Sequence, residues 1–190
     1  LSSLIDIPNF ISYNILQLYS SNTDWPHNNI QYWRYEGDMV STERGPFDGR
    51  WRWILQDLDH SFGYIEGPQF DMISHMFSEE DAKFSLNRNL LISLLEHQSI
   101  FNTFIQEIAM HLNTTFRSDR VLKVLRDHIE KISYIMPAQY ERWGYPSEEQ
   151  WNEELALMLD YAERRPTYMR QQVVEFFPEV TGIAQLTITG

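Results

Sequence analysis

The chain of 190 residues has a formal net charge of −12, no Cys and an apolar fraction of 43%. This length is typical of one domain with a substantial core. The negative charge argues against a nucleic-acid partner or an anionic membrane surface, since both attract basic patches. The absence of Cys excludes disulfides and thiolate metal sites. No apolar run is long enough to predict a membrane span.

The first predicted element is a helix between about residues 6 and 20. Asp6 is a suitable N-cap, and Pro8 is tolerated in the first helical turn. Apolar and aromatic side chains follow at helical spacing: Phe10, Ile11, Ile15, Leu18 and Tyr19. We therefore expect a helix that ends just before the polar segment 22–29.

Two segments rich in Trp, Tyr and Ile, residues 30–35 and 50–55, predict a pair of antiparallel strands. Residues 36–49 between them are rich in Gly, Asp and Glu and predict a variable loop. After the second strand, Gly63, Gly67 and Pro68 predict an irregular stretch.

The chain is predicted to be helical from Ser85 onward. A capping box at Ser147 and Gln150 begins a last long helix, which Pro166 is expected to end or kink. Residues 182–189 have the composition of a strand. Two apolar stripes precede the last helix, namely Ile100, Phe101, Phe104, Ile105, Ile108 and Leu112, and then Val121, Leu125, Ile129, Ile132 and Met136. The predicted fold is mainly α-helical with a small antiparallel β-hairpin.

The spacing of Asp24 and Asn29 is the first indication of chemistry. Kinase-type phosphoryl transfer uses an aspartate that orients a hydroxyl, an asparagine that binds metal, and a second aspartate that joins metal to the phosphates. Asp24 and Asn29 have the spacing of the first two groups in the kinase catalytic loop. Taken alone, Asp24 is better explained as an Asx-turn residue, and Asn28 is an alternative amide.

Asp57 and Asp59 end the second predicted strand and are the candidates for the remaining acid. On a regular strand they would face the same side, where two carboxylates repel each other and a bound cation relieves the repulsion. A solvated strand end is the alternative that needs no cation. A calcium loop of EF-hand type fails at Phe62 and Pro68, where glycine and an acid are required.

Taken together, the two motifs, 24–29 (DWPHNN) and 51–63 (WRWILQDLDHSFG), resemble the CotH kinase family of atypical kinases. Further similarities are Tyr13 and Leu18 with their neighbours, and later the pairs Arg142-Trp143 and Arg165-Pro166. The resemblance extends over about residues 5–180.

The resemblance implies the C-terminal lobe of an atypical protein-kinase-like fold over residues 1–180, followed by a tail, 181–190, that leads to another element. No Gly-rich phosphate loop and no strand-borne lysine precede the catalytic loop, so an N-terminal lobe is missing from the chain. We therefore expect the chain to be inactive by itself.

The resemblance also implies the site and its ligands. Asp24 is the expected catalytic residue, and the expected metal ligands are Asn29, Asp57 and Asp59, with Asp57 ranked above Asp59. The implied cofactors are ATP with Mg²⁺ or Mn²⁺. The implied substrate is a Ser or Thr hydroxyl of a coat or surface protein, which places the protein at a spore coat or cell surface.

Two other classes of protein remain open. A glycoside hydrolase would use two of the aspartates as its acid–base pair, and a non-catalytic module would keep the fold for binding or structure. The six His residues match no metal-binding pattern, although His27 and His60 lie within the motifs. Four Trp residues are candidates for stacking on adenine or a sugar, but core packing is their more common role: Trp25, Trp33, Trp51 and Trp53.

Overall fold

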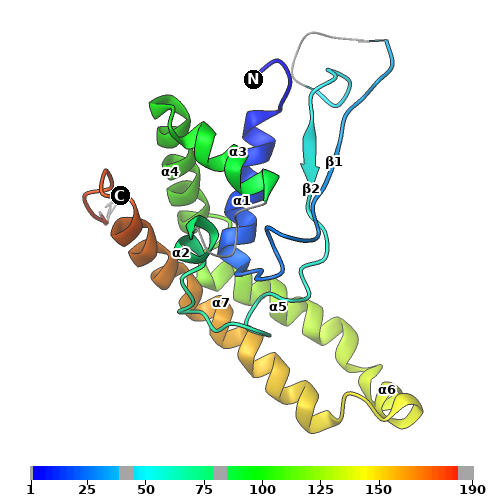
Figure 1. The fold of residues 1–190 in the computed structure, drawn as a ribbon. Helices are drawn as coiled ribbons and strands as arrows, with labels where there is room; N and C mark the ends of the chain where they lie inside the picture. Colours follow the sequence, from blue (N-terminus) through cyan, green and yellow to red (C-terminus); the bar gives the residue numbers. More distant parts are fainter. Residues whose placement is uncertain (1, 39–44, 79–84, 184–190) are drawn as a thin grey trace, which may run out of the picture.

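The computed structural model describes residues 2–38, 45–78 and 85–183. This part of the chain contains seven helices and one two-stranded antiparallel sheet (Figure 1). The predicted mainly helical fold with a small hairpin is therefore confirmed. The elements are α1 (Ile7–Ser20), β1 (Gln31–Trp33), β2 (Arg52–Ile54), α2 (Met72–Phe77), α3 (Leu86–Leu95), α4 (Gln98–Asn113), α5 (Ser118–Ser133), α6 (Met136–Trp143) and α7 (Glu148–Phe176).

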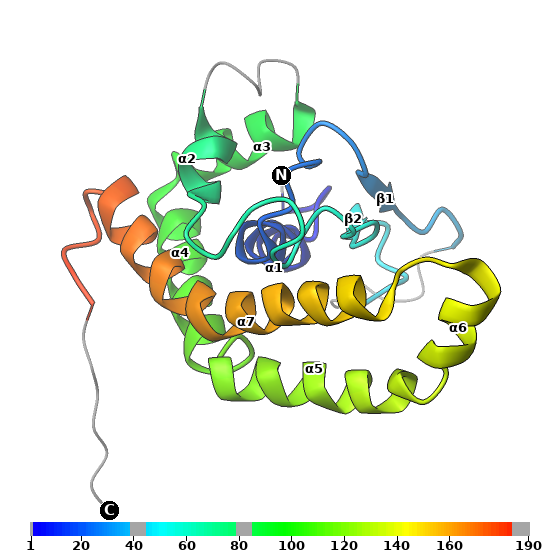
Figure 2. The same cartoon turned by 90° about the horizontal axis from the view of Figure 1, so that it is seen from below.

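Helix α1 lies at the centre of the molecule, and Figure 2 looks along its axis with the other elements around it. The Asp6 carboxylate caps the helix by accepting a hydrogen bond from the Asn9 backbone N–H at 3.2 Å. The predicted first helix and its cap are thus confirmed. Its surroundings explain why it is so apolar, because most of its side chains are buried, including Phe10, Ile11, Ile15, Leu18 and Tyr19.

The hairpin is shorter than the predicted strands and pairs Tyr32 with Trp53 at its centre. It is fastened to α1 through Asn9, whose side-chain oxygen accepts a hydrogen bond from the Trp53 backbone N–H at 2.7 Å. The Trp53 ring also lies edge-on to Phe10, with 4.5 Å between ring centroids. Residues 39–44 of the predicted variable loop lie outside the described residues.

A group of ion pairs holds the base of the hairpin against the start of α1. The Arg52 guanidinium lies 2.8 Å from the Asp48 carboxylate and 2.9 Å from the Asp6 carboxylate. Arg50 adds a further contact to Asp48 at 2.8 Å. Hydrogen bonds from Arg52 are the main reason that the pKa of Asp48 lies well below its ordinary value.

Helices α5, α6 and the first half of α7 form an arm that extends from the main body (Figures 1 and 2). The predicted stripe over residues 121–136 is divided here, because α5 ends at Ser133 and Met136 begins α6. Pro137 accounts for the break, since it has no backbone N–H to donate to the carbonyl four residues earlier, at Ser133.

Helix α7 runs through Pro166 to Phe176, and Figure 2 shows that it bends in its orange second half. Of the two expected outcomes at Pro166, an end or a kink, the helix does not end there and its bend agrees with the kink. The helix continues because buried side chains surround the proline, including Ala162, Arg165 and Met169, and this packing outweighs the lost backbone hydrogen bond. The capping box of Ser147 and Gln150 is confirmed at its start.

One helix was not predicted. Helix α2 follows the irregular stretch, and the Asp71 side chain caps it by accepting from the Ser74 N–H at 3.0 Å. Its six residues are too few for periodicity to show it in the sequence. Of the predicted last strand, residues 182 and 183 have no regular structure and residues 184–189 lie outside the described residues. No helix in the described part is long and apolar enough to span a membrane.

Candidate active site

Asp24 lies in the loop that follows α1 and is held at both carboxylate oxygens. Asn28 Nδ2 donates to Asp24 Oδ1, and Asn29 Nδ2 donates to Asp24 Oδ2, each at 2.7 Å. Since the nitrogen of each amide faces Asp24, the amide oxygen is directed away from it. The loop therefore fixes the aspartate and leaves two neutral oxygen ligands beside it.

Two buried side chains, Trp25 and Asn22, anchor this loop to the rest of the domain. Trp25 is 0% exposed and lies edge-on to Tyr13, which shows that it is a core anchor. Asn22, also buried, donates through Nδ2 to Gln17 Oε1 at 3.0 Å and to the Asp57 carbonyl at 3.4 Å. Asn22 thus links the loop of Asp24 to the loop of Asp57, a role that nothing in the sequence spacing had indicated.

The loop after β2 brings Asp57 close to the other acids. The pKa of Asp57 is raised, first by the negative charge of Asp59 and then also by partial desolvation, a hydrogen bond with Asp59 and the charge of Asp24. His60 acts in the opposite direction on Asp57. The candidate residues on the two loops are therefore within electrostatic reach of each other.

The predicted reason for the proximity of Asp57 and Asp59 was wrong. Asp57 and Asp59 were expected to share one face of a regular strand, but β2 ends at Ile54 and Asp57 has a φ of 50°. A left-handed residue turns the chain out of the strand direction. Asp57 and Asp59 are neighbours because of this turn.

The described backbone is strained at four non-glycine residues, and all four lie in the two acid-bearing loops or at their edges. Positive φ angles of 50–57° occur at Ser21, Asn29, Asp57 and Phe62. Each such residue costs about 1–3 kcal/mol, and such conformations are concentrated at functional sites. The strain thus coincides with the candidate site.

The segment after the acids is docked on α1 and α7. The Phe62 N–H donates to the Ser20 carbonyl at 3.0 Å, and the Phe62 ring packs against Tyr161 with centroids 5.3 Å apart. Gly63 has a φ of 92°, and a Cβ there would lie 3.1 Å from the Leu157 carbonyl oxygen. Glycine is therefore required at this position, both for its conformation and for the close approach to α7.

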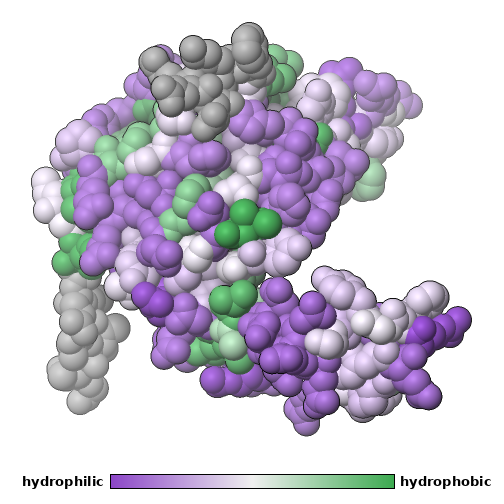
Figure 3. Space-filling model, turned by 60° about the horizontal axis from the view of Figure 1, so that its bottom comes forward, coloured by the Kyte–Doolittle hydropathy of each residue, from purple (hydrophilic) through white to green (hydrophobic). Residues whose placement is uncertain are grey.

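A hollow of 480 Å³ adjoins Asp59 on the side of the arm. Asp59 belongs to its wall, and Glu154 lies opposite on α7. Figure 3 shows the molecule hollowed where the arm leaves the main body. The remaining wall is largely apolar, formed by Leu58, Ser61, Phe62, Tyr64, Leu125 and Met158. Of the candidate site residues, Asp59 lines this hollow, whereas Asp24, Asn29 and Asp57 do not.

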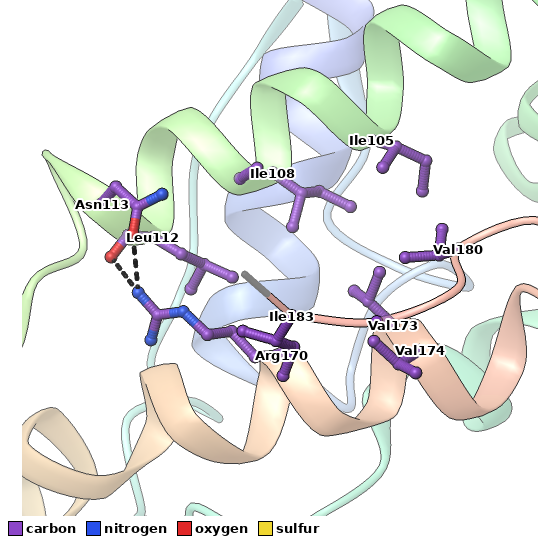
Figure 4. Close-up of a pocket in the computed structure, with 11 residues that line it drawn as sticks. Ile105, Ile108, Leu112, Asn113, Arg170, Val173, Val174, Val180 and Ile183 are labelled. Atoms are coloured by element: carbon purple, nitrogen blue, oxygen red, sulfur yellow. Dashed lines mark hydrogen bonds between the residues drawn. The ribbon is translucent and has the colours of Figure 1, made fainter. Parts of the chain in front are cut away.

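A second hollow, of 190 Å³, lies between α4 and α7 and is shown in Figure 4. Its wall is mainly aliphatic, with Arg170 at one end donating to the Leu112 carbonyl at 2.7 Å and to Asn113 Oδ1 at 3.2 Å. It contains no carboxylate or imidazole, so it lacks groups for acid–base or metal chemistry.

The donor set of the acid loops suits a hard divalent cation. Among the described residues, no three His, Asp or Glu side chains form a closed metal site. Mg²⁺ does not need one, since it retains several waters and takes one or two carboxylates together with phosphate oxygens. Asp57, Asp59 and the oxygen of Asn29 are the groups that fit this role.

On this small helical domain, an aspartate held by two amide side chains therefore lies in a loop that contacts a second loop with two aspartates. The comparison with protein families agrees, because the family described as CotH kinase protein matches residues 1–169. The chain belongs to the CotH kinase family, and this membership indicates a kinase-like function. A comparison with curated proteins and one with solved structures gave no match.

Proposed function

We propose that this chain is the catalytic-loop half of an atypical protein Ser/Thr kinase that depends on ATP and on Mg²⁺ or Mn²⁺. The observation that carries the proposal is the Asp24 carboxylate, held at both oxygens by Asn28 and Asn29 and close enough to Asp57 to raise its pKa. This is the combination that phosphoryl transfer requires of a protein, namely positioning and a place for charge compensation.

Each residue has a distinct role in the proposal. Asp24 orients the attacking hydroxyl and accepts its proton, because its carboxylate is fixed in place. Asn29 and Asp57 hold the divalent cation, which when bound neutralises charge on the phosphates. Asp59 supports Asp57 and adds negative charge beside the cation. The substrate is a Ser or Thr hydroxyl of a coat or surface protein, as the family resemblance implies.

The rival reading as a glycoside hydrolase is less well supported by the geometry. Such an enzyme needs two carboxyl groups roughly 5–10 Å apart across a sugar. The negative charge of Asp59 is instead the main cause of the raised pKa of Asp57, and two neighbouring carboxylates on one turn suit a shared cation better than a sugar placed between them. A non-catalytic module remains testable, because it predicts that substitution of the acids changes stability and nothing else.

Nucleotide binding provides the first test. We expect Mn²⁺ with ATP to raise the melting temperature of the longest natural polypeptide that contains these residues, and neither ligand alone to do so fully. Transfer of labelled γ-phosphate to Ser- and Thr-containing protein should accompany it. The matched control is Asp119→Asn, which removes an exposed aspartate of α5 that pairs with Arg117, outside the acid loops. If neither binding nor transfer occurs, the kinase proposal is wrong.

A further inference from the structure

Arg165 on α7 has surroundings that are unusual for a charged side chain. It is 0% exposed, and its hydrogen-bond partners are mainly backbone carbonyls rather than a carboxylate. Two of these lie in the last turn of α1, Leu18 at 2.7 Å and Tyr19 at 3.0 Å. Two others lie in the stretch before α2, Phe70 at 2.7 Å and Pro68 at 3.2 Å. One guanidinium therefore joins two segments that are distant in the sequence.

These two segments are the supports of the two acid-bearing loops. The last turn of α1 leads through the left-handed residue Ser21 into the loop of Asp24. The stretch at residues 68–70 follows the loop that contains Asp57 and Gly63. One turn earlier on α7, the Tyr161 hydroxyl donates to the Tyr19 carbonyl and shares a second hydrogen bond of 2.9 Å with the Ser21 hydroxyl. The same face of α7 thus holds the base of both loops.

We propose that Arg165, assisted by Tyr161, is the positioning residue of the acid loops and sets the distance between Asp24 and Asp57. Burying a charge without a carboxylate partner is unfavourable, so core packing alone does not explain an arginine here. The guanidinium offers five donors in a rigid planar fork, which reaches carbonyls on both segments at once. Lysine has the same charge without this fork.

Arg170 provides a matched control on the same helix. It too donates to the carbonyl at the end of a helix, Leu112 of α4, at 2.7 Å (Figure 4). The hydrogen bonds that it makes within the described part of the chain go to Pro166, Leu112 and Asn113, none of which belongs to an acid-bearing loop, and it lines the aliphatic hollow. A lysine at position 170 therefore loses a similar set of hydrogen bonds without disturbing the supports of Asp24 and Asp57.

The test measures the distance between the loops directly. Because the chain has no Cys, spin labels can be placed at His27→Cys and Ile65→Cys, one on each loop. We expect a narrow distance distribution that Arg165→Lys broadens at least twofold and Arg170→Lys leaves unchanged. A second labelled pair, Gln106→Cys and Gln171→Cys, reports on the packing of α4 against α7 and should be unchanged by Arg165→Lys.

The proposal would be overturned if Arg165→Lys lowers the melting temperature but the distance distribution between the labels at positions 27 and 65 stays narrow. Arg165 would then be a residue of the core without a positioning role. If this variant does not fold, Tyr161→Phe is measured in its place and should broaden the same distance by a smaller factor. An unchanged distance in Tyr161→Phe would then count against the proposal.

The consequence for catalysis rests on the proposed function. Since small misplacement of reacting groups costs roughly 10²-fold in rate, Arg165→Lys should slow single-turnover phosphoryl transfer about ten- to a hundredfold, and Arg170→Lys should not. If the wild-type protein transfers no phosphate, the proposed function fails, whereas the spin-label distances still decide whether Arg165 positions the loops.

Discussion

At the scale of single residues, Asp24 and Asp57 have the same side chain in different surroundings. Asp24 is half-buried, and amide groups hold both of its oxygens. Asp57 is exposed and lies beside other negative charges that raise its pKa. A fixed carboxylate is suited to orienting a hydroxyl, whereas a carboxylate repelled by its neighbours is suited to binding a cation.

This difference predicts separate effects for the two substitutions. Asp24→Asn should slow phosphoryl transfer by roughly a hundredfold or more, the scale of a lost general base, with little change in nucleotide affinity. Asp57→Asn should instead weaken Mn²⁺-dependent ATP binding, and Asp59→Asn should have an effect between the two. Single-turnover transfer and Mn²⁺–ATP affinity, measured on the same variants, separate the roles. Near-normal transfer by Asp24→Asn would show that Asp24 is only a turn residue.

A second prediction concerns the pH dependence of Asp57. Because its pKa is raised in the folded state, its contribution to stability is present below the ordinary carboxyl pKa and is lost as pH rises through the raised value. Without metal, Asp57→Asn should therefore raise the melting temperature at pH 7 and change it little at pH 3. Calorimetry at both pH values checks this, and a lower melting temperature for Asp57→Asn at pH 7 would contradict it.

The same pKa shift applies to cation binding. Mn²⁺ binds the ionised carboxylate and competes with the proton. We expect Mn²⁺ affinity to fall with decreasing pH at a midpoint above the ordinary aspartate value, and Asp57→Asn to remove this dependence. Titration of Mn²⁺ by calorimetry across pH 4–8 is the measurement. A midpoint at or below the ordinary value would contradict the proximity of the acids.

Only part of the candidate site was predictable at this scale. The separation of Asp24 and Asn29 placed an amide beside the acid, and the structure shows that contact. The left-handed conformation of Asp57 was not predictable, because tertiary contacts rather than local preference impose it. Arg165 was visible only as part of a family landmark, since a buried arginine and a surface arginine look alike in a sequence.

At the scale of elements, the hairpin depends on the ion pairs at its base. The Asp48 side chain is only 4% exposed and faces both Arg50 and Arg52. Its lowered pKa in the folded state stabilises the fold above the ordinary carboxyl pKa, and this stabilisation is lost as pH falls through and below that value. The ion pairs at the base of the hairpin should therefore persist until the pH lies well below the ordinary carboxyl pKa.

Asp48→Asn should lower the free energy of unfolding at pH 7 by about 1–3 kcal/mol, because it leaves two arginines without part of their partner set. Urea unfolding at pH 7 gives the value. Asp119→Asn serves as control, since its exposed ion pair with Arg117 is expected to change stability by less than about 0.5 kcal/mol. Equal effects of the two variants would show that the ion pairs at the hairpin base contribute little.

The start of α7 allows a further prediction at this scale. Ser147→Ala removes one half of the capping box and should cost about 1 kcal/mol. The loss should appear mainly as faster amide hydrogen exchange in the first turns of α7, because this part belongs to the exposed arm. Ser133→Ala at the end of α5, whose hydroxyl bonds the Ile129 carbonyl, should leave that exchange unchanged. Uniform acceleration in both variants would contradict a local role for the cap.

Secondary structure was predictable wherever a local signal was strong. Asp6 and Ser147 marked helix starts correctly. The end of α5 was not predicted, because it depends on where a proline falls in a turn. For α7 the sequence left an end or a kink at Pro166 open, because the packing around the proline decides between them. The short helix α2 lacked a periodic signal altogether.

At the scale of the whole molecule, the proposed kinase site has no counterpart in this sequence of the parts that cover ATP in known kinases. Kinases hold the phosphates with a Gly-rich loop and a strand-borne lysine, and the sequence shows neither. The hairpin and the residue that follows it also expose apolar side chains, namely Tyr32, Ile54 and Leu55. These observations support the proposal that a further lobe completes the site.

We therefore predict that residues 1–190 alone bind Mn²⁺–ATP weakly and give no measurable phosphoryl transfer. The longest natural polypeptide containing them should bind ATP more tightly and be active. Calorimetric titration and labelled phosphate transfer on the two proteins test this. Robust transfer by residues 1–190 would show that the chain already contains everything that the reaction needs.

The central position of α1 has a consequence for the synthesis of the protein on the ribosome. In its last turn, the Tyr19 carbonyl accepts hydrogen bonds from Tyr161 and Arg165. These two residues follow Tyr19 in the chain by 142 and 146 residues. At about 5–20 residues per second, this separation leaves the apolar helix without its final partners for roughly 7–28 s. Early chaperone contact should therefore be concentrated on α1, and translation that stops before α7 should yield an aggregation-prone chain.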